Sequence, residues 1–130
     1  QEANGDVTLM GRVDDTIRCG GENIQPEEIE TVLAAHPGVA ACSVIGIPDA
    51  HWGQIVVGCI TTDGDALDPK DLDAHCRNST LAGYKRPKAY VTMDTLPRNA
   101  ANKILRRVLR DQAIAARDGG DASFHALSAF

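Results

Sequence analysis

Apolar residues recur along the chain with two different periods, and each period predicts one kind of element. The spacing of Ile29, Val32 and Leu33 predicts a helix that starts at Pro26, because proline suits the first helical turn. Asp68 before a proline has the character of a helix N-cap and predicts a second helix. A third apolar stripe lies opposite a basic face near the end of the chain. The predicted helices cover residues 26–35, 68–78 and 104–117.

Runs of β-branched and apolar residues, bounded by proline, glycine and aspartate, predict the strands. These runs cover residues 7–12, 16–19, 39–47, 54–62 and 89–93. Together with the helices they give the order ββ-α-β-β-α-β-α, which indicates an α+β fold whose strands are covered by helices on one side. After Arg117 the chain is rich in glycine, serine and aspartate without a regular period, so we expect it to be frayed.

Composition narrows the possible functions. The 130 residues suffice for one domain with a single core, and a net charge of −5 argues against a nucleic-acid partner. No apolar run approaches the ~20 residues of a membrane span. The four cysteines form no CxxC pair and the four histidines show no ligand spacing, so no metal site is predicted. Cysteines within apolar runs favour a cytoplasmic protein with buried thiols.

Two separate stretches carry candidate chemistry. In residues 11–30, GRVDDTIRCGGENIQPEEIE, the pair Gly20 and Gly21 permits positive φ and lets a bound molecule approach the backbone. Local physics alone indicates a turn followed by a capped helix. In residues 96–107, LPRNAANKILRR, Lys103 stands where a loop meets a predicted helix. The plain interpretation is an exposed lysine in a first helical turn, where the helix dipole disfavours a cation.

In order and separation, these two stretches resemble signatures of the adenylate-forming enzymes, a superfamily of acyl- and aryl-CoA synthetases, peptide-synthetase adenylation domains and luciferases. The resemblance covers residues 7 to 112, and Asn102–Lys103 is most similar to aryl-CoA ligases of the 4-chlorobenzoate-CoA ligase type. It implies the small C-terminal domain of such an enzyme: a three-stranded sheet with flanking helices, plus an N-terminal β-hairpin.

The resemblance also implies domain boundaries and partners. Residues 1–13 would end the N-terminal adenylating domain of the same chain and approach the hinge. Residues 14–117 would form the C-terminal AMP-binding-enzyme domain, and residues 118–130 a flexible tail. The preceding domain would hold most of the ATP with its Mg²⁺, and the carboxylic acid substrate. The isolated domain is therefore expected to be inactive.

Individual roles follow from the same resemblance. Lys103 would be the catalytic lysine of adenylation, Asp14 the hinge between two domain orientations, and Arg12 a contact to the nucleotide ribose. A set of residues would bind CoA in the second orientation: Gly20, Gly21, Glu22, Trp52, Tyr84, Arg86 and Lys88. The competing interpretation is that Trp52 caps the sheet core and the two cations lie in a solvated loop.

Two other functions stay open. The chain could be the C-terminal part of a peptide-synthetase adenylation domain that loads a carrier protein, or a non-catalytic module that binds a nucleotide or a partner. The presence of Trp52, Arg86 and Lys88 favours free CoA as the thiol. Basic residues on the last predicted helix, among them Arg106, are expected to be solvated. The sequence does not identify the acid.

Overall fold

The computed structural model describes residues 16–62, 68–81, 83–121 and 123–127. The predicted strand over residues 7–12 and the residues Arg12 and Asp14 lie outside these ranges. Among the described residues, no helix is sufficiently long and apolar to cross a bilayer.

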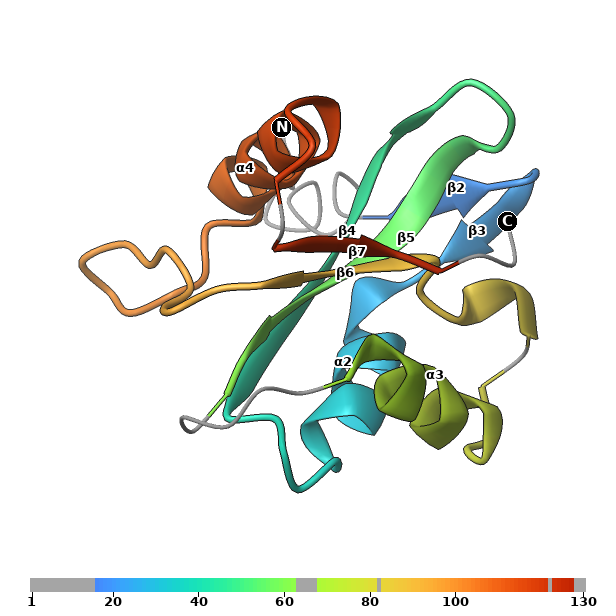
Figure 1. The fold of residues 1–130 in the computed structure, drawn as a ribbon, viewed down its shortest axis with the longest axis horizontal. Helices are drawn as coiled ribbons and strands as arrows, with labels where there is room; N and C mark the ends of the chain where they lie inside the picture. Colours follow the sequence, from blue (N-terminus) through green and yellow to red (C-terminus); the bar gives the residue numbers. More distant parts are fainter. Residues whose placement is uncertain (1–15, 63–67, 82, 122, 128–130) are drawn as a thin grey trace, which may run out of the picture.

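Six strands of the described chain form one mixed sheet (Figure 1). They are β2 (Ile17–Cys19), β3 (Glu22–Ile24), β4 (Ala41–Asp49), β5 (Gly53–Thr61), β6 (Ala89–Thr92) and β7 (Phe124–Ala126). Their order is β3-β2-β5-β6-β7, with β4 also paired to β5. Only the β5–β6 pairing among these is parallel. The predicted α+β class is confirmed, but the sheet has more strands than the three expected at its centre.

Three α-helices lie within the described ranges: α2 (Pro26–Ala34), α3 (Pro69–Arg77) and α4 (Arg106–Asp118). Pro26 and Pro69 each occupy a first helical position, as predicted. The Asp68 side chain accepts a hydrogen bond from the backbone N–H of Lys70 at 2.9 Å, which confirms it as an N-cap. α4 begins two residues later than predicted, because Ile104 instead forms a β-bridge with Arg98.

Helices cover both faces of the sheet, so the prediction of one covered face is wrong. Figure 1 shows α2 and α3 on one side of the sheet and α4 on the other. Along β4, Val44 packs in the hydrophobic cluster with α2 and α3, whereas Ile45 packs in the cluster with α4. Successive side chains of a strand point to opposite faces, so a strand covered on both faces needs an unbroken apolar run. Residues 44–47 and 55–60 provide such runs.

The end of the chain also differs from the prediction. Residues 124–126 form β7, which pairs antiparallel with β6, so this part of the predicted flexible tail has regular structure. The pairing extends beyond the strand, since the N–H of Leu127 donates to the carbonyl of Lys88 at 2.9 Å. The strand was missed because it follows a stretch rich in glycine, serine and aspartate, a composition that favours the prediction of an irregular tail.

Candidate functional site

Five of the predicted site residues fall into two regions, which we name for their residues. The glycine–tryptophan corner comprises Gly20, Gly21, Trp52 and Lys88, and the lysine loop comprises residues 97–105. In Figure 1 the orange loop that leads into α4 and the blue β2–β3 turn lie at opposite ends of the molecule's longest axis.

The corner begins with a tight hairpin turn between β2 and β3. Gly20 and Gly21 have φ values of +60° and +86°, which residues with a side chain rarely adopt. The strand β3 after this turn was not predicted, because the glycines were expected to lead directly toward the helix. Glu22, the first residue of β3, pairs with Cys19 across the turn and is exposed. A Cβ atom on Gly21 would meet no atom within 4 Å, so its surface is open to an approaching molecule.

Trp52 stands beside this turn because the β4–β5 connection fixes its backbone. Asp49 Oδ2 accepts hydrogen bonds from the backbone N–H groups of His51 and Trp52, both at 2.9 Å. The Trp52 carbonyl accepts a further one from the N–H of Gly20 at 2.9 Å. A Cβ atom on Gly20 would lie 3.1 Å from the indole ring, so the glycine permits this close approach. The corner is therefore built from two turns, which are joined by a backbone hydrogen bond and by close packing of Gly20 against Trp52.

The Trp52 ring contacts both the core and a cation. It is half-buried and packs against the hydrophobic clusters on both faces of the sheet, as the interpretation of a core cap requires. The Lys88 ammonium lies over the ring, 4.3 Å from its centroid, in a cation–π contact. Burial raises the pKa of the neighbouring Cys19 thiol, and the Lys88 charge acts in the opposite direction. Trp52 and Lys88 are thus brought together as the sequence suggested.

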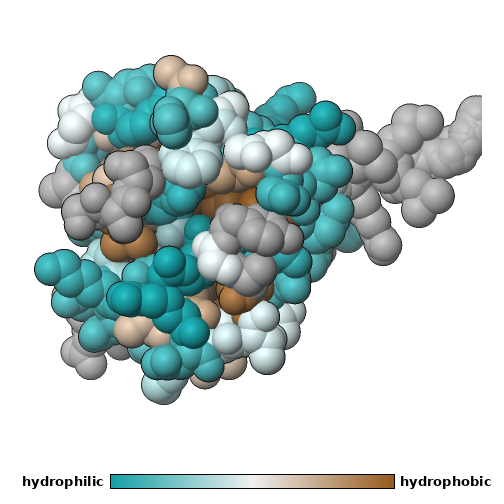
Figure 2. Space-filling model, turned by 90° about the vertical axis from the view of Figure 1, so that its right-hand side faces the viewer, coloured by the Kyte–Doolittle hydropathy of each residue, from teal (hydrophilic) through white to brown (hydrophobic). Residues whose placement is uncertain are grey.

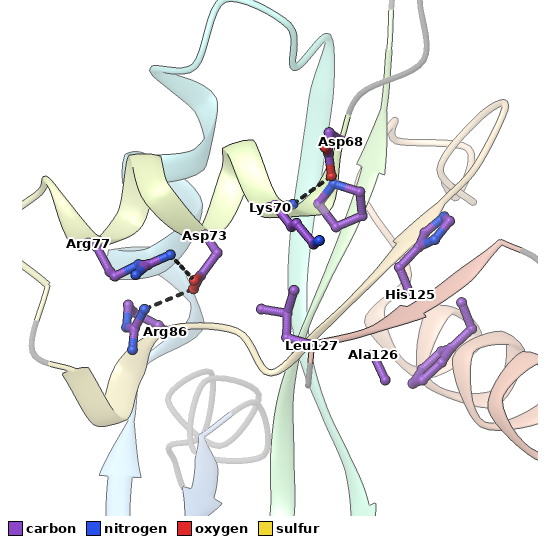
Figure 3. Close-up of a pocket in the computed structure, with 10 residues that line it drawn as sticks. Asp68, Lys70, Asp73, Arg77, Arg86, His125, Ala126 and Leu127 are labelled. Carbon is purple, nitrogen blue, oxygen red and sulfur yellow. Dashed lines mark hydrogen bonds and ion pairs between the residues drawn. The ribbon is translucent and has the colours of Figure 1, made fainter. Parts of the chain in front are cut away.

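Arg86 belongs to a neighbouring pocket. A cavity of about 730 Å³ lies between α3 and β7, and Arg86 is among the residues that line it. As Figure 3 shows, the Asp73 carboxylate holds two guanidinium groups, with Arg86 Nη1 at 2.9 Å and Arg77 Nη2 at 3.0 Å. Tyr84 lies in a short 3-10 helix (Gly83–Lys85), and its side chain is outside the described part of the chain.

The surface around the corner is mainly polar. Figure 2 views the molecule from the side on which the β2–β3 hairpin and the β4–β5 turn lie in Figure 1. Hydrophilic side chains dominate this face, and apolar surface is visible mainly in recesses between them.

Backbone and side-chain hydrogen bonds close the lysine loop on itself. The N–H of Leu105 donates to the carbonyl of Pro97 at 2.9 Å, next to the Arg98–Ile104 bridge. Inside this closure, Asn99 Oδ1 accepts hydrogen bonds from the N–H groups of Ala101 at 2.9 Å and Lys103 at 3.0 Å. One asparagine side chain therefore organises the turn that carries the lysine.

Lys103 is exposed at this turn, and it precedes α4 rather than standing inside its first turn. Asn102 before it has φ of +64°, the one positive value among non-glycine residues of the described ranges. This left-handed conformation suits asparagine better than most other residues with a side chain. Within the described residues, no carboxylate lies within ion-pair distance of the Lys103 ammonium. The side chain thus presents its charge outward.

One basic residue expected to be solvated is instead partly buried in an ion pair. Arg106 Nη2 lies 2.9 Å from both carboxylate oxygens of Glu30, which belongs to α2. The two residues are separated by 76 positions in the sequence, so no local sequence pattern predicts their contact. An arginine at the start of one helix and a glutamate in the middle of another were the available signals, but they did not specify a pair.

We also searched the described part of the chain for a metal site and for a reactive cysteine. No group of three His, Cys, Asp or Glu side chains there is arranged to hold a metal ion. Burial raises the pKa of the Cys42 thiol to about 11 and that of the Cys59 thiol to about 12. Thiols that remain protonated near neutral pH are poor nucleophiles. The exposed lysine and the glycine–tryptophan corner stay the best candidates.

Comparison with known proteins confirms the C-terminal domain that the sequence motifs predicted. Residues 28–103 match the family described as AMP-binding enzyme C-terminal domain. The chain is 51% identical over 110 residues to a 4-chlorobenzoate–CoA ligase of Pseudomonas sp. (strain CBS-3), covering 84% of this chain and 21% of that protein. It is 42% identical over 112 residues to the fatty acid–[acyl-carrier-protein] ligase ScoC of Streptomyces coeruleorubidus, covering 85% and 21%.

Among solved structures, a fatty acyl CoA synthetase of Mycobacterium tuberculosis superposes with a TM-score of 0.76 at 40% sequence identity. The superposition covers 81% of this chain and 21% of that one. The chain therefore spans about a fifth of the length of the relatives it matches.

Proposed function

We propose that this chain, which belongs to the AMP-binding enzyme C-terminal domain family, is the mobile C-terminal part of an ATP-dependent acyl- or aryl-CoA ligase. The observation that carries the proposal is the placement of the lysine loop and the glycine–tryptophan corner at opposite ends of one domain (Figure 1). A domain with two separate functional ends has to turn between the two half-reactions, with Asp14 as the proposed hinge.

The lysine loop serves the first half-reaction, in which a carboxylate attacks the α-phosphate of ATP. This step brings two anions together and expels pyrophosphate. The exposed Lys103 ammonium would lie between carboxylate and phosphate oxygens and stabilise the developing charge. No proton has to move, so a compact point charge is sufficient. Arg12 contacts the ribose of the nucleotide.

The corner serves the second half-reaction, in which the thiol of CoA attacks the acyl-adenylate and releases AMP. The open backbone at Gly21 lets the narrow pantetheine arm pass, and Gly20 and Glu22 border its path. Trp52 and Lys88 bind the nucleotide end of CoA, since an aromatic ring beside cations suits an adenine that carries phosphates. Tyr84 and Arg86 lie in the adjoining loop and complete this set.

Other components are proposed to lie outside the described residues. We assign Mg²⁺, which accompanies ATP, and the acid pocket to an N-terminal adenylating domain. A cytoplasmic location stays a prediction, consistent with the four free thiols. The identity of the acid is not assigned.

A carrier protein is the second candidate for the thiol. It is favoured by the similarity to a ligase whose name gives an acyl-carrier-protein as acceptor. Lys88→Gln discriminates between the two acceptors. With free CoA it is expected to raise the KM for CoA, whereas an unchanged KM for CoA would favour the carrier protein.

The experiment that tests the main proposal is Lys103→Ala in the complete ligase, with the two half-reactions measured separately. We expect adenylation, followed by acid-dependent pyrophosphate exchange, to fall by about 10²–10³-fold, as for loss of one transition-state charge donor. Thioester formation from a preformed acyl-adenylate is expected to stay near its original rate. An equal loss in both half-reactions would contradict the role of Lys103.

A further inference from the structure

Helix α2 carries acidic side chains that pair with basic residues of two different segments. Glu28 Oε1 lies 2.6 Å from the ammonium of Lys85, in the loop that leads to β6. Glu30 pairs with Arg106, the first residue of α4. α2 and α4 cover opposite faces of the sheet, so the second pair joins the two helical layers around the β4 edge.

The Glu30 carboxylate is fully engaged. Its two oxygens accept hydrogen bonds from Arg106 Nη2 at 2.9 Å each. Its Oε2 also accepts from the backbone N–H of Val44 at 2.8 Å and from the Ser43 hydroxyl at 3.2 Å. The side chains of Glu30 and Arg106 are only 20% and 23% exposed. Charge-assisted contacts with this little solvent fix geometry more strongly than an open surface pair.

The position of Arg106 in its helix makes this pairing necessary. A cation at the first residue of a helix meets the positive end of the helix dipole and is disfavoured there. The first turn of α4 contains no acidic residue that offsets the charge. Glu30 supplies the compensation from α2, and Glu27 adds a longer contact to Arg106 Nη1 at 3.5 Å.

Arg106 also ends the segment that holds Lys103. Between the two residues lie Ile104, bridged to Arg98, and Leu105, whose N–H bonds to the carbonyl of Pro97. The loop is therefore tied to itself at its base, and the base is tied to the rest of the domain immediately afterwards through Arg106. Release of Arg106 would let the closed loop shift as a unit, although its own hydrogen bonds remain.

We propose that the Glu30–Arg106 pair positions Lys103 for adenylation. This inference rests on the proposed function of Lys103, and it assigns Glu30 and Arg106 as positioning residues that do not touch the reacting atoms. Misplacement of a catalytic group by about 1 Å can lower a rate by roughly 10²-fold, so loss of this ion pair should have a measurable effect.

The chain offers a matched control on the same helix. Glu30→Gln keeps an oxygen that can accept from Val44 and Ser43, but it removes the charge that holds Arg106. Glu28→Gln makes the same chemical change two residues earlier. Its partner there is Lys85, which lies in the loop before β6 and not beside the lysine loop. A general effect of lost charge on α2 would appear in both variants.

The test uses the complete ligase, with Lys103→Ala measured in parallel. For Glu30→Gln and Arg106→Gln we expect the kcat of adenylation to fall about ten- to hundredfold with little change in the KM for ATP. Thioester formation from preformed acyl-adenylate should be unchanged. Arg106→Lys, which keeps the charge, should recover part of the adenylation rate, and Glu28→Gln should retain it.

Three results would overturn the inference. The first is normal adenylation by Glu30→Gln and Arg106→Gln where Lys103→Ala is inactive, which would leave the proposed function intact. The second is an equal loss in both half-reactions, which would indicate a general structural role. The third is the same loss in Glu28→Gln as in Glu30→Gln. Normal adenylation by Lys103→Ala would instead contradict the proposed function itself.

Discussion

The two ends of the domain are built by different interactions. At the glycine–tryptophan corner, two turns lock against a half-buried indole ring that also packs on the core. At the lysine loop, an exposed turn is held by hydrogen bonds from Asn99 and by the ion pair of Arg106 behind it. Apolar packing of Trp52 and the positive φ of two glycines thus add to backbone hydrogen bonds in the first region, whereas polar contacts hold the second.

This difference implies that the two ends respond differently to substitution. A change at the corner disturbs packed atoms and should appear as a loss of stability. A change at the loop leaves the core intact, so it should appear mainly as a loss of geometry around Lys103. Stability and activity measured on the same variants therefore separate the two ends.

The largest expected effect on stability is that of Gly20→Ala. The new Cβ would lie 3.1 Å from Trp52, at a φ of +60° that alanine disfavours. Strain and crowding together should lower the free energy of unfolding by about 2 kcal/mol. Urea denaturation measures the change, with Gly21→Ala as control. Gly21→Ala has the backbone strain without the contact and should lose only about 1 kcal/mol. Equal losses in the two variants would contradict the close packing of Trp52.

Asn99→Ala should affect stability less and the lysine loop more. It removes an acceptor used by the N–H groups of Ala101 and Lys103, both near the surface. Because water can satisfy exposed N–H groups, the free energy of unfolding should fall by only about 1 kcal/mol. Adenylation by the complete ligase should nevertheless fall about tenfold while thioester formation is retained. Asn99→Asp, which keeps the acceptor, should restore most of the rate, and failure to do so would weaken the assigned role.

A smaller effect is expected at the residue before the lysine. Asn102 has φ of +64°, so Asn102→Gly should be tolerated, with a free energy of unfolding within about 0.5 kcal/mol of the original. Asn102→Val should be clearly worse, because β-branched residues are poorly accommodated at positive φ. Thermal melts of the two variants and their adenylation rates provide the comparison. A valine variant as active as the glycine variant would show that this backbone conformation is not required.

The last prediction concerns pH and reports on the core near Glu30. Burial raises the pKa of Cys42 from its ordinary value of 9.0 to about 11. The folded state therefore favours the protonated thiol, whose stabilising contribution is complete below pH 9 and is lost as pH rises through 11. Urea denaturation at pH 8 and pH 10.5 should show a smaller decline for Cys42→Ala than for the original chain. An identical decline would mean that this thiol is not desolvated.

The sequence predicts the helices well because their signals are local. Pro26 and the pair Asp68–Pro69 specify helix starts within a few residues, and the structure confirms both. The coverage of the sheet was predicted wrongly, although the unbroken apolar runs in residues 44–47 and 55–60 indicate strands buried on both faces. The place of β7 beside β6 depends on a distant pairing and has no comparable local signal.

In the candidate site, too, local features were predictable from the sequence and distant contacts were not. The conformations at Gly20 and Gly21 follow from residue type, and the contact between Trp52 and Lys88 agrees with the predicted set. In contrast, the ion pairs of Arg86 with Asp73 and of Arg106 with Glu30 depend on how the helices pack. No partner within the chain was therefore predicted for these two arginines from the sequence. The roles of all these residues stay predictions.

The most direct test of the central claim is a crossed measurement of both half-reactions in one complete ligase. Lys103→Ala represents the lysine loop, and Lys88→Gln represents the corner. We expect the first variant to lose adenylation and retain thioester formation, and the second to retain adenylation and require more CoA. If each variant reduced both half-reactions to the same extent, the assignment of the two ends to two separate steps would be contradicted.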